Sequence, residues 1–341
     1  MTDTAATAAC PSCGFELAED ERFCEACGLD IDPDVRAAVL GPVASADACA
    51  ACGEAFDPKS SGYCGVCGIK QPAPGDRREA VERDVAAVTD RGRRRARNED
   101  AFAVGRTAGG RVLAVVCDGV STTTSGDQAS KRAAGAALEA MLDADERSGA
   151  DSLTAAFLAA RDAVNDLEWT PKGNAGPPSC TFLAAIATHS QVELSSVGDC
   201  RAFWIPEHGA PERLTTDDSW AAEQELAGTM TSEAAHADAR AHSITRWLGA
   251  DADPSWEPRR TSFSASQPGR LVLCSDGLWN YAATAADVAD LAGMGAPLTE
   301  ARRFVDHANG RGGQDNITVV VIRIVGHLDS PASLIERNVT Q

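Results

Sequence analysis

Four segments of this chain place a carboxylate beside a glycine, an asparagine or a second acid, at or near the end of an apolar run. They are RNEDAFAV with Asp100, VLAVVCDGV with Asp118, RLVLCSDGLW with Asp276 and GGQDNITVVVIRI with Asp315. Short apolar runs bounded by Gly or Asp are typical of buried strands. Several carboxylates that converge at strand ends need cations to stay ionised at neutral pH, and hard divalent cations prefer such oxygen ligands. The pattern predicts a carboxylate-built metal centre, and therefore a hydrolase.

Composition limits the remaining functions. The 341 residues, of which 44% are hydrophobic, can form one large domain or two, with a full core. The formal net charge of −19 argues against nucleic-acid binding and anionic-membrane binding, because phosphate contacts need Lys and Arg. The sequence shows no apolar stretch of about 18 residues and no signal-peptide pattern at its start. We therefore expect a cytoplasmic protein.

Eight of the twelve cysteines lie near the start of the chain as four C-x-x-C pairs, which form two similar units. Each unit offers four thiolates to one tetrahedral Zn²⁺. Disulfides are disfavoured in a reducing compartment, and a thioredoxin-like redox pair would need a βαβ context that is missing here. We expect two structural zinc ions, and both units resemble short zinc ribbons. The expected ligands are Cys10, Cys13, Cys24 and Cys27 in the first unit, and Cys49, Cys52, Cys64 and Cys67 in the second.

The ribbons are expected to bind protein rather than nucleic acid. Residues 1–75 contain 12 acidic and 4 basic side chains, and a surface of this sign repels phosphate. A docking or regulatory role is favoured, and a purely structural role is the alternative. The expected domain plan is zinc ribbon 1 over 1–34, zinc ribbon 2 over 45–70, a linker over 71–84, a catalytic domain over 85–327 and a tail over 328–341. The segment between the ribbons is expected to be a linker with one helical turn.

From about Val85 onward, eight motifs resemble the metal-dependent (type 2C) serine/threonine protein phosphatase family in their order and spacing. They are TDRGRRRARNEDAF, CDGV, SCTF, VGDCRAF, LTTDDSW, GTMTSEAAHADARAHSITRWLGAD, LVLCSDGLW and GGQDNITVVVI. The resemblance implies an α+β fold: an αββα sandwich of two antiparallel sheets flanked by helices, with the metals at one edge. Helical periodicity over 127–144 and 151–169 agrees with this fold, as do short apolar strands at 181–187, 192–197 and 201–205.

The resemblance also implies residue roles. Asp118 would bridge two Mg²⁺ or Mn²⁺ ions, Asp199 with Asp276 would bind a third ion, and Arg95 would bind the substrate phosphate. A planar guanidinium can bind two phosphoryl oxygens at once. For the run RGRRRAR, the alternative is a nucleic-acid or targeting patch. The full set of expected Mg²⁺ or Mn²⁺ ligands is Glu99, Asp100, Asp118, the carbonyl of Gly119, Asp199, Asp276 and Asp315.

The function implied by this resemblance is hydrolysis of phosphoserine and phosphothreonine in proteins, by a hydroxide activated at the dinuclear centre. Its partners would be phosphorylated substrates of a serine/threonine kinase. The alternative is a catalytically weak, phosphatase-like adaptor that acts mainly by binding protein through the ribbons. The presence of Arg95 and of the aspartates at 118, 276 and 315 favours the enzyme.

Two positions depart from the family pattern. A Ser/Thr run follows Gly119, where the family usually has one or two further glycines and its eukaryotic members have a histidine. The general acid is therefore not identified by the sequence. Asp218 stands where the family commonly has a histidine, at the base of a segment next to the active site, so we expect the geometry of that segment to differ.

Overall fold

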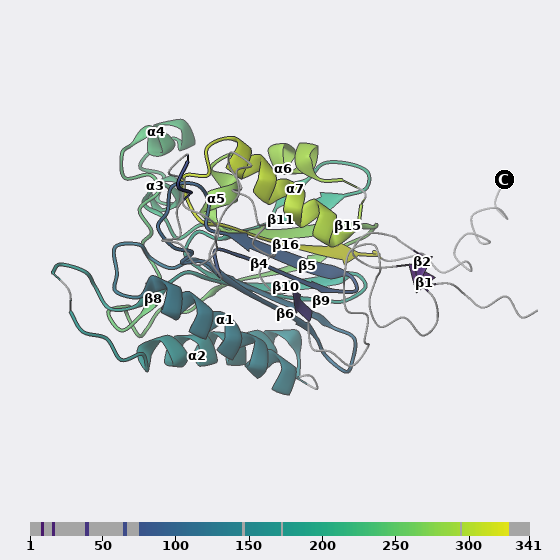
Figure 1. The fold of residues 1–341 in the computed structure, drawn as a ribbon, viewed down its shortest axis with the longest axis horizontal. Coiled ribbons are helices and arrows are strands. Elements are labelled where there is room, and N and C mark those ends of the chain that lie inside the picture. The colour runs from purple at the N-terminus through teal and green to yellow at the C-terminus, as the bar shows by residue number, and fades with distance from the viewer. Residues whose placement is uncertain are drawn as a thin grey trace, which may run out of the picture.

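A computed structural model describes residues 64–66, 75–144, 147–171, 173–293 and 295–326, with the backbone of three short strands at 8–9, 16–17 and 38–40. Within these residues no helix is long and apolar enough to cross a membrane. The fold is a sandwich of two antiparallel sheets between two layers of helices, so the expected fold class is confirmed (Figure 1).

The larger sheet has seven strands in the order β12-β11-β15-β16-β5-β4-β3, and all of its pairs are antiparallel. Its central strands are continuous apolar runs that are buried on both faces, which explains why they lack polar alternation. The strands are β3 (Ala38–Leu40), β4 (Arg77–Glu82), β5 (Val85–Asp90), β11 (Arg201–Pro206), β12 (Glu212–Arg213), β15 (Gly269–Cys274) and β16 (Ile317–Ile324).

The second sheet has five strands in the order β14-β10-β9-β7-β6, again antiparallel throughout. Its edge strand β14 alternates between half-buried and exposed residues, whereas β7 and β9 are buried along their whole length. The expected strands at 181–187, 192–197 and 201–205 are confirmed as β9, β10 and β11. The strands of this sheet are β6 (Ala101–Arg106), β7 (Val112–Cys117), β9 (Phe182–Ala187), β10 (Gln191–Val197) and β14 (Arg259–Ser264).

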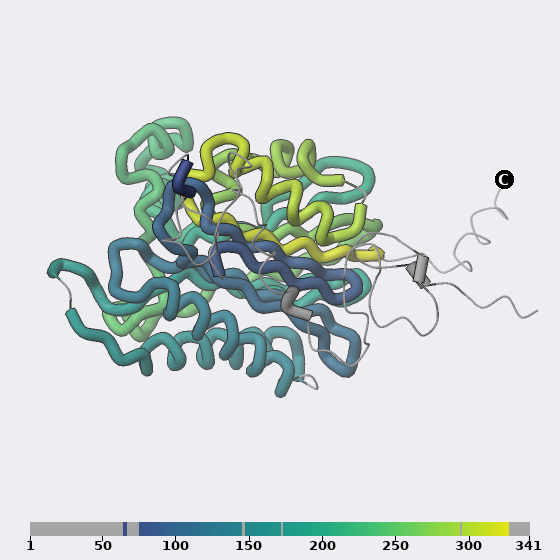
Figure 2. Tube along the Cα trace, viewed as in Figure 1, coloured from purple at the N-terminus to yellow at the C-terminus, as the bar shows by residue number. Residues whose placement is uncertain are grey.

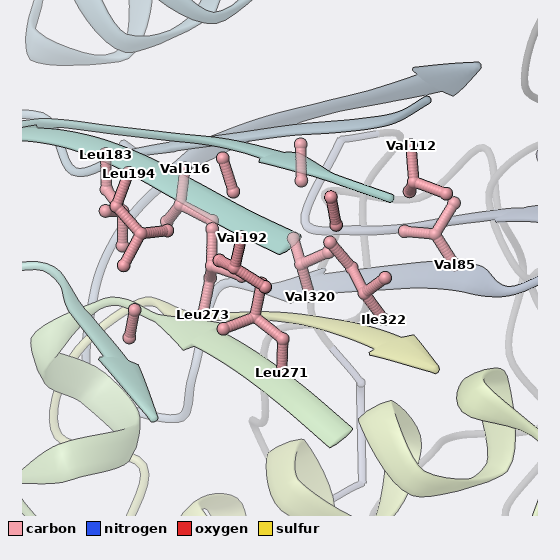
Figure 3. Packing of buried hydrophobic residues seen from close by; sticks show 14 of the residues in the cluster. Val85, Val112, Val116, Leu183, Val192, Leu194, Leu271, Leu273, Val320 and Ile322 are labelled. Carbon is pink, nitrogen blue, oxygen red and sulfur yellow. The ribbon is translucent and has the colours of Figure 1, made fainter. Parts of the chain in front are cut away.

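The inner faces of the two sheets share one hydrophobic core. Figure 3 shows branched aliphatic side chains from both sheets meeting there, including Val116 and Leu183 from the smaller sheet and Leu271 and Val320 from the larger one. Each of these four side chains is fully buried. Because β-branched and other aliphatic side chains fill such a layer at crystal-like density, the two sheets are held in a fixed register. The strand ends on which the candidate site depends are therefore fixed as well.

Helices cover the outer face of each sheet (Figure 2). α1 (Gly126–Asp143) and α2 (Gly149–Asn165) pack on the five-stranded sheet, through a core that includes Met141 and Phe182. α5 (Asp276–Trp279), α6 (Ala285–Leu291) and α7 (Pro297–Gly310) pack on the seven-stranded sheet around Phe304. The expected helices at 127–144 and 151–169 are confirmed by α1 and α2.

Local signals in the sequence mark where several helices begin. The Ser148 side chain accepts a hydrogen bond from Asp151 N–H at the start of α2, and Thr284 with Asp287 forms a capping box on α6. Pro297 starts α7, where its missing N–H costs no helical hydrogen bond. Three small units complete the described fold: the β8–β13 pair (Ser179–Cys180 with Leu248–Gly249), the β1–β2 pair (Ala8–Ala9 with Glu16–Leu17), and the helices α3 (Trp220–Leu226) and α4 (Ser232–Ala237).

Two expectations about the linkers need revision. β4 spans Arg77–Glu82 and pairs with β5, so most of the expected linker over 71–84 belongs to the seven-stranded sheet. The segment expected to hold a helical turn between the ribbons contains instead the strand Ala38–Leu40, which pairs with β4. In both cases main-chain pairing with a neighbouring strand outweighs the polar or alanine-rich local sequence.

Candidate active site

The acidic motifs lie at strand ends of both sheets. Asp100 precedes β6 and Asp118 follows β7 in the smaller sheet, whereas Asp276 follows β15 and Asp315 precedes β16 in the larger sheet. Asp199 lies in the turn that connects β10 of one sheet to β11 of the other. The fold thus brings together five carboxylates from segments that are far apart in the sequence.

These carboxylates affect one another's charge. Desolvation raises the pKa of Asp118 well above its ordinary value, and the like charges of Asp100, Asp276, Asp199 and Asp315 raise it further. Desolvation and the charge of Asp276 likewise raise the pKa of Asp199. Burial is also the main cause for Asp100, whose pKa rises to about 7, and for Asp276, whose pKa rises to about 6. Raised pKa values mean that the ionised forms of these acids are disfavoured, and a bound cation would stabilise the ionised forms.

Two buried carboxylate oxygens at this cluster have no hydrogen-bond partner among the described residues: Oδ1 of Asp100 and Oδ1 of Asp276. Their second oxygens are used, because Ser275 Oγ donates to Asp100 Oδ2 at 2.7 Å and Asn280 Nδ2 approaches Asp276 Oδ2 at 3.3 Å. No three acidic, histidine or cysteine side chains of the described segments are gathered into a ready coordination shell. The free oxygens and the all-oxygen donor set nevertheless fit a hard divalent cation.

The glycines that follow Asp118 and Asp276 allow the acidic segments to pack closely. A Cβ on Gly119 would lie 2.5 Å from the main-chain oxygen of Gly126 and 2.7 Å from that of Glu99. A Cβ on Gly277 would lie 1.9 Å from the main-chain oxygen of Asn316. Any larger residue would therefore force these segments apart, which explains the Asp-Gly pairs that the sequence shows twice.

Glu99 and Asp100 are held firmly through their backbone. The N–H of Glu99 donates to Asn316 Oδ1 at 2.8 Å, and the carbonyl of Glu99 accepts from the N–H of Gly119 at 3.1 Å. The Glu99 carboxylate itself accepts from Arg97 at 2.9 Å. Asp100 is 3% exposed and Glu99 is 6% exposed, so both acids of the pair lie inside the site rather than on its surface.

Arg95 lies beside the acidic cluster, as the sequence predicts. Its Nη2 lies 2.5 Å from Asp315 Oδ2, and this hydrogen bond is the main cause that raises the pKa of Arg95. The charges of Asp276 and Asp118 act in the same direction. Because 37% of the Arg95 side chain is exposed, its guanidinium remains accessible to a ligand at the edge of the cluster.

Three polar residues that the sequence analysis did not single out organise the site. Asn316 Nδ2 donates to the main-chain oxygens of Arg91 and Arg97, at 2.8 and 2.9 Å, and so holds both ends of the loop that carries Arg95. Thr181 Oγ1 accepts from the N–H of Asp118 at 2.9 Å, and Ser275 joins Asp100 to β16 by accepting from the N–H of Thr318 at 3.0 Å. The available signal was their position next to or within the acidic motifs.

Asp199 is 6% exposed, and its turn is fixed from the side of α5. Trp279 Nε1 donates to the main-chain oxygen of Asp199 at 2.9 Å. Arg201, two residues after Asp199, forms a buried ion pair with Asp217 at 2.8 Å. Arg201 still acts on Asp199 through its charge, but burial and the charges of Asp276 and Asp217 outweigh it and raise the pKa of Asp199.

Of the eight expected zinc ligands, Cys64 lies within the described residues, and Cys10, Cys13, Cys24, Cys27, Cys49, Cys52 and Cys67 lie outside them. Cys64 is 3% exposed, and its Sγ accepts a hydrogen bond from the N–H of Val66 at 3.4 Å. An amide that turns back to a thiolate two residues earlier is compatible with a zinc knuckle.

Comparison with known proteins agrees with both parts of the chain. The family model for protein phosphatase 2C matches residues 89–308, and the model for a double zinc ribbon matches residues 10–68. The chain is 29% identical over 238 residues to the serine/threonine phosphatase stp of Listeria monocytogenes, which covers 69% of this chain and 93% of that protein. It is 32% identical over 247 residues to the serine/threonine protein phosphatase PstP of Mycobacterium tuberculosis, which covers 71% of this chain and 45% of PstP.

The fold has solved counterparts. The catalytic domain of a serine/threonine protein phosphatase PstP in complex with two manganese ions is 27% identical and superposes with a TM-score of 0.55, over 70% of this chain and 97% of that one. The family match covers most of the sandwich, including the strands that carry Asp100, Asp118 and Asp276. This chain therefore belongs to the protein phosphatase 2C family and carries a double zinc ribbon before its phosphatase domain.

Proposed function

We propose that this protein is a metal-dependent phosphatase that hydrolyses phosphoserine and phosphothreonine in proteins. The observation that carries this proposal is the convergence of five buried or half-buried aspartates beside one accessible arginine. Like charges in such a cluster repel unless cations neutralise them, and a phosphoryl group needs a cation at its oxygens. The names of the stp and PstP relatives support the substrate class.

The residues that would hold Mg²⁺ or Mn²⁺ are those expected from the sequence. Asp118 lies close enough to four other aspartates for their charges to raise its pKa, so it would be the central ligand of the set. Asp276 and Asp315 would contribute from the ends of β15 and β16 in the other sheet. When bound, divalent ions at such a cluster lower the pKa of water and neutralise charge on phosphoryl oxygens. The remaining proposed ligands are Glu99, Asp100, the carbonyl of Gly119 and Asp199, of which Asp199 would serve a third ion.

Arg95 would bind the phosphate. Its guanidinium has five N–H donors in a fixed plane, of which one from Nη2 contacts Asp315, so other donors can reach two phosphoryl oxygens. The main chain that carries Arg95 is also held in place: Arg91 Nη1 donates to the main-chain oxygen of Arg95, and Asn316 Nδ2 binds the main chain at both ends of the loop. The arginine is thus positioned before substrate arrives, which lowers the entropic cost of binding in the reactive geometry.

The double zinc ribbon is proposed to bind two structural zinc ions and to dock a protein partner. Closed sites with four cysteine ligands leave no open position for a substrate. The acidic composition of residues 1–75 favours a basic or neutral protein surface over nucleic acid as the partner. With β4 included, the phosphatase domain is proposed to extend from about residue 75 to residue 326.

The proposal is tested with the full-length protein and a matched pair of peptides, one with phosphoserine and one with phosphotyrosine at the same position. Phosphate release is measured after treatment with EDTA, and again after addition of Mn²⁺ or Mg²⁺. We expect release from the phosphoserine peptide only with added metal, and little from the phosphotyrosine peptide. Failure to hydrolyse any phosphopeptide at saturating Mn²⁺ would favour the adaptor function.

A further inference from the structure

Residues 219–245, here named the flap, form a small unit that leaves the sandwich and returns to it at one point. The N–H of Thr245 donates to the main-chain oxygen of Asp218 at 2.8 Å, so both ends of the flap meet at Asp218. Inside the flap, α3 and α4 pack on a core of their own formed by Ala221, Ala235 and Ala241. Asp218 therefore lies where the two ends of the flap join the sandwich.

The same residue also holds the turn that carries Asp199. The N–H of Asp218 donates to the main-chain oxygen of Gly198 at 2.8 Å, and Asp218 Oδ2 accepts from the N–H of Gly198 at 3.1 Å. Gly198 is thus bound through both of its main-chain groups, and the next residue in the chain is Asp199. Only 2% of the Asp218 side chain is exposed, so these contacts are shielded from water.

The remaining oxygen of Asp218 binds arginine. Arg259 Nε, from β14, lies 2.7 Å from Asp218 Oδ1, and Nε of Arg246, the residue directly after the flap, lies 3.7 Å from the same oxygen. A buried carboxylate without such partners would be costly. Asp218 thus joins three parts of the molecule: the Asp199 turn, the flap and the edge of the five-stranded sheet.

The preceding residue holds the other side of the same turn. Asp217 binds Arg201 through Nε and Nη2, and the guanidinium of Arg201 lies 3.7 Å from the centre of the Trp279 ring. Trp279 in turn donates to the main-chain oxygen of Asp199. Trp279 also packs against His242 of the flap, with ring centres 5.5 Å apart. Two sets of contacts therefore link the flap to the turn that carries Asp199. One consists of the hydrogen bonds of Asp218, and the other is the packing of His242 on Trp279.

We propose that Asp218 is a positioning residue that fixes the Asp199 turn and the flap to each other. A movement of the flap relative to Asp218 then also shifts Asp199. Access to the acidic cluster and the position of one proposed metal ligand therefore change together. A neutral histidine at this position has a single acceptor nitrogen, so it could not accept from Gly198 N–H and Arg259 Nε at once. The aspartate therefore holds this junction of the flap and the Gly198 main chain with one more hydrogen bond than a histidine at this position would. The inference rests on the proposed function only where Asp199 is treated as a metal ligand.

The coupling is tested by hydrogen–deuterium exchange of the full-length protein with its zinc retained and with Mg²⁺ and Mn²⁺ absent, followed by mass spectrometry. The variants are Asp218→His, Asp218→Asn and, as a control, Asp238→Asn, which neutralises a half-buried flap carboxylate paired with Arg240. In Asp218→His we expect exchange to accelerate by about tenfold in peptides covering both 196–202 and 219–245. Asp218→Asn keeps an acceptor for Gly198 but loses the ion pair, so a smaller acceleration of both peptides is expected. The control should match the wild type.

Acceleration in the flap alone, with the turn unchanged in both Asp218 variants, would overturn the coupling, and so would wild-type exchange throughout. Because Mg²⁺ and Mn²⁺ are absent, this result does not depend on the phosphatase assignment. Asp218→Asn covers the case in which Asp218→His fails to fold. A second measurement follows hydrolysis of an aryl phosphate against Mn²⁺ concentration. We expect half-maximal activation of Asp218→His to need about tenfold more Mn²⁺ while KM stays close to the wild-type value. An unchanged Mn²⁺ requirement would overturn the link to Asp199.

Discussion

The guanidinium of Arg95 lies 2.5 Å from Oδ2 of Asp315, so the arginine proposed to bind phosphate is held by one of the proposed metal ligands. The two residues are 220 positions apart in the chain and come from opposite ends of the phosphatase domain. Their contact joins the phosphate-binding group to the acidic cluster. A change in either residue should therefore affect substrate binding and the cluster together.

Replacing Arg95 by alanine should lower kcat/KM for a phosphopeptide by at least about tenfold, because a charge-assisted hydrogen bond contributes roughly 1.5–3 kcal/mol. Arg95→Lys should recover part of this loss, since it keeps the charge and loses the planar pair of donors. Arg93→Ala is the matched control, because this side chain is exposed and its one hydrogen bond within the described part of the chain goes to the main-chain oxygen of Asn309. Equal losses in Arg93→Ala and Arg95→Ala would mean that the arginines attract the substrate through their summed positive charge, with no specific role for Arg95.

Arg91 is unsuitable as a silent control. Its Nε lies 3.0 Å from Asp76 Oδ2, and its Nη1 donates to the main-chain oxygen of Arg95. The side chain is 14% exposed. Arg91→Ala should therefore lower the thermal stability and, through the Arg95 loop, the activity.

The acidic cluster predicts an unusual pH dependence of stability for metal-free protein. Asp100 has a pKa of about 7 in the fold against an ordinary value of 3.8, mainly because it is buried. A raised pKa means that the folded state binds the proton more tightly, so the stabilising effect of protonation is lost as pH rises towards 7. In EDTA, lowering the pH from about 7 to about 5 should therefore raise the stability contributed by this group.

This effect is measured by comparing the melting temperature of wild type and Asp100→Asn in EDTA across that pH range. The asparagine cannot titrate, so the variant should show a smaller change of melting temperature with pH. Added Mn²⁺ should stabilise the wild type more at neutral pH than at pH 5, because protons and metal compete for the same oxygens. Identical pH profiles for the two proteins would show that Asp100 keeps an ordinary pKa.

The backbone conformation of Ser125 allows a test of stability that does not involve a charged group. It has φ 58° and ψ 42°, the left-handed region, and its side chain makes no capping hydrogen bond to α1. Left-handed backbone costs a non-glycine residue roughly 1–2 kcal/mol, and the greater freedom of glycine in the unfolded chain offsets part of that gain. Ser125→Gly should raise the free energy of unfolding by about 0.5–1 kcal/mol in urea, while Ser125→Ala should be nearly neutral. Destabilisation by glycine would mean that the Ser125 side chain has a role that its contacts do not show.

The ribbons predict a zinc content that is separable from catalysis. Full-length protein purified under reducing conditions should contain about two zinc equivalents, whereas a chain lacking residues 1–74 should contain none. The truncation ends before Asp76 because that residue binds Arg91 and because β4 begins at Arg77. The shortened protein should still hydrolyse an aryl phosphate. Loss of that activity would show that the ribbons, or the strand β3 between them, support the phosphatase domain.

Much of the fold and the acidic cluster could be predicted because the signals are local or repeated. The apolar run of β7 followed by Asp118, and the run of β15 followed closely by Asp276, each mark a buried strand with a carboxylate at its end. The helical periodicity of α1 and α2 extends over several turns, which makes it distinct from that of a strand.

The remaining features depend on contacts between distant segments. β4 has the sequence RREAVE, which looks like an exposed charged linker until pairing with β5 buries its centre. Asn316 could not be identified as the residue that holds the Arg95 loop, because its three partners lie more than 200 positions earlier. The pairing of Arg201 with Asp217 rather than Asp199 likewise depends on how the chain returns after β12.

The central claim, that the converging aspartates form the catalytic metal site, is tested most directly by Mn²⁺ binding to Asp118→Asn. Calorimetric titration of zinc-loaded, manganese-free protein should show about two Mn²⁺ ions bound to the wild type. Asp118→Asn should bind fewer ions or bind them far more weakly, should lose phosphatase activity by orders of magnitude, and should keep the wild-type far-ultraviolet circular dichroism. Wild-type Mn²⁺ binding and activity in Asp118→Asn would contradict the account.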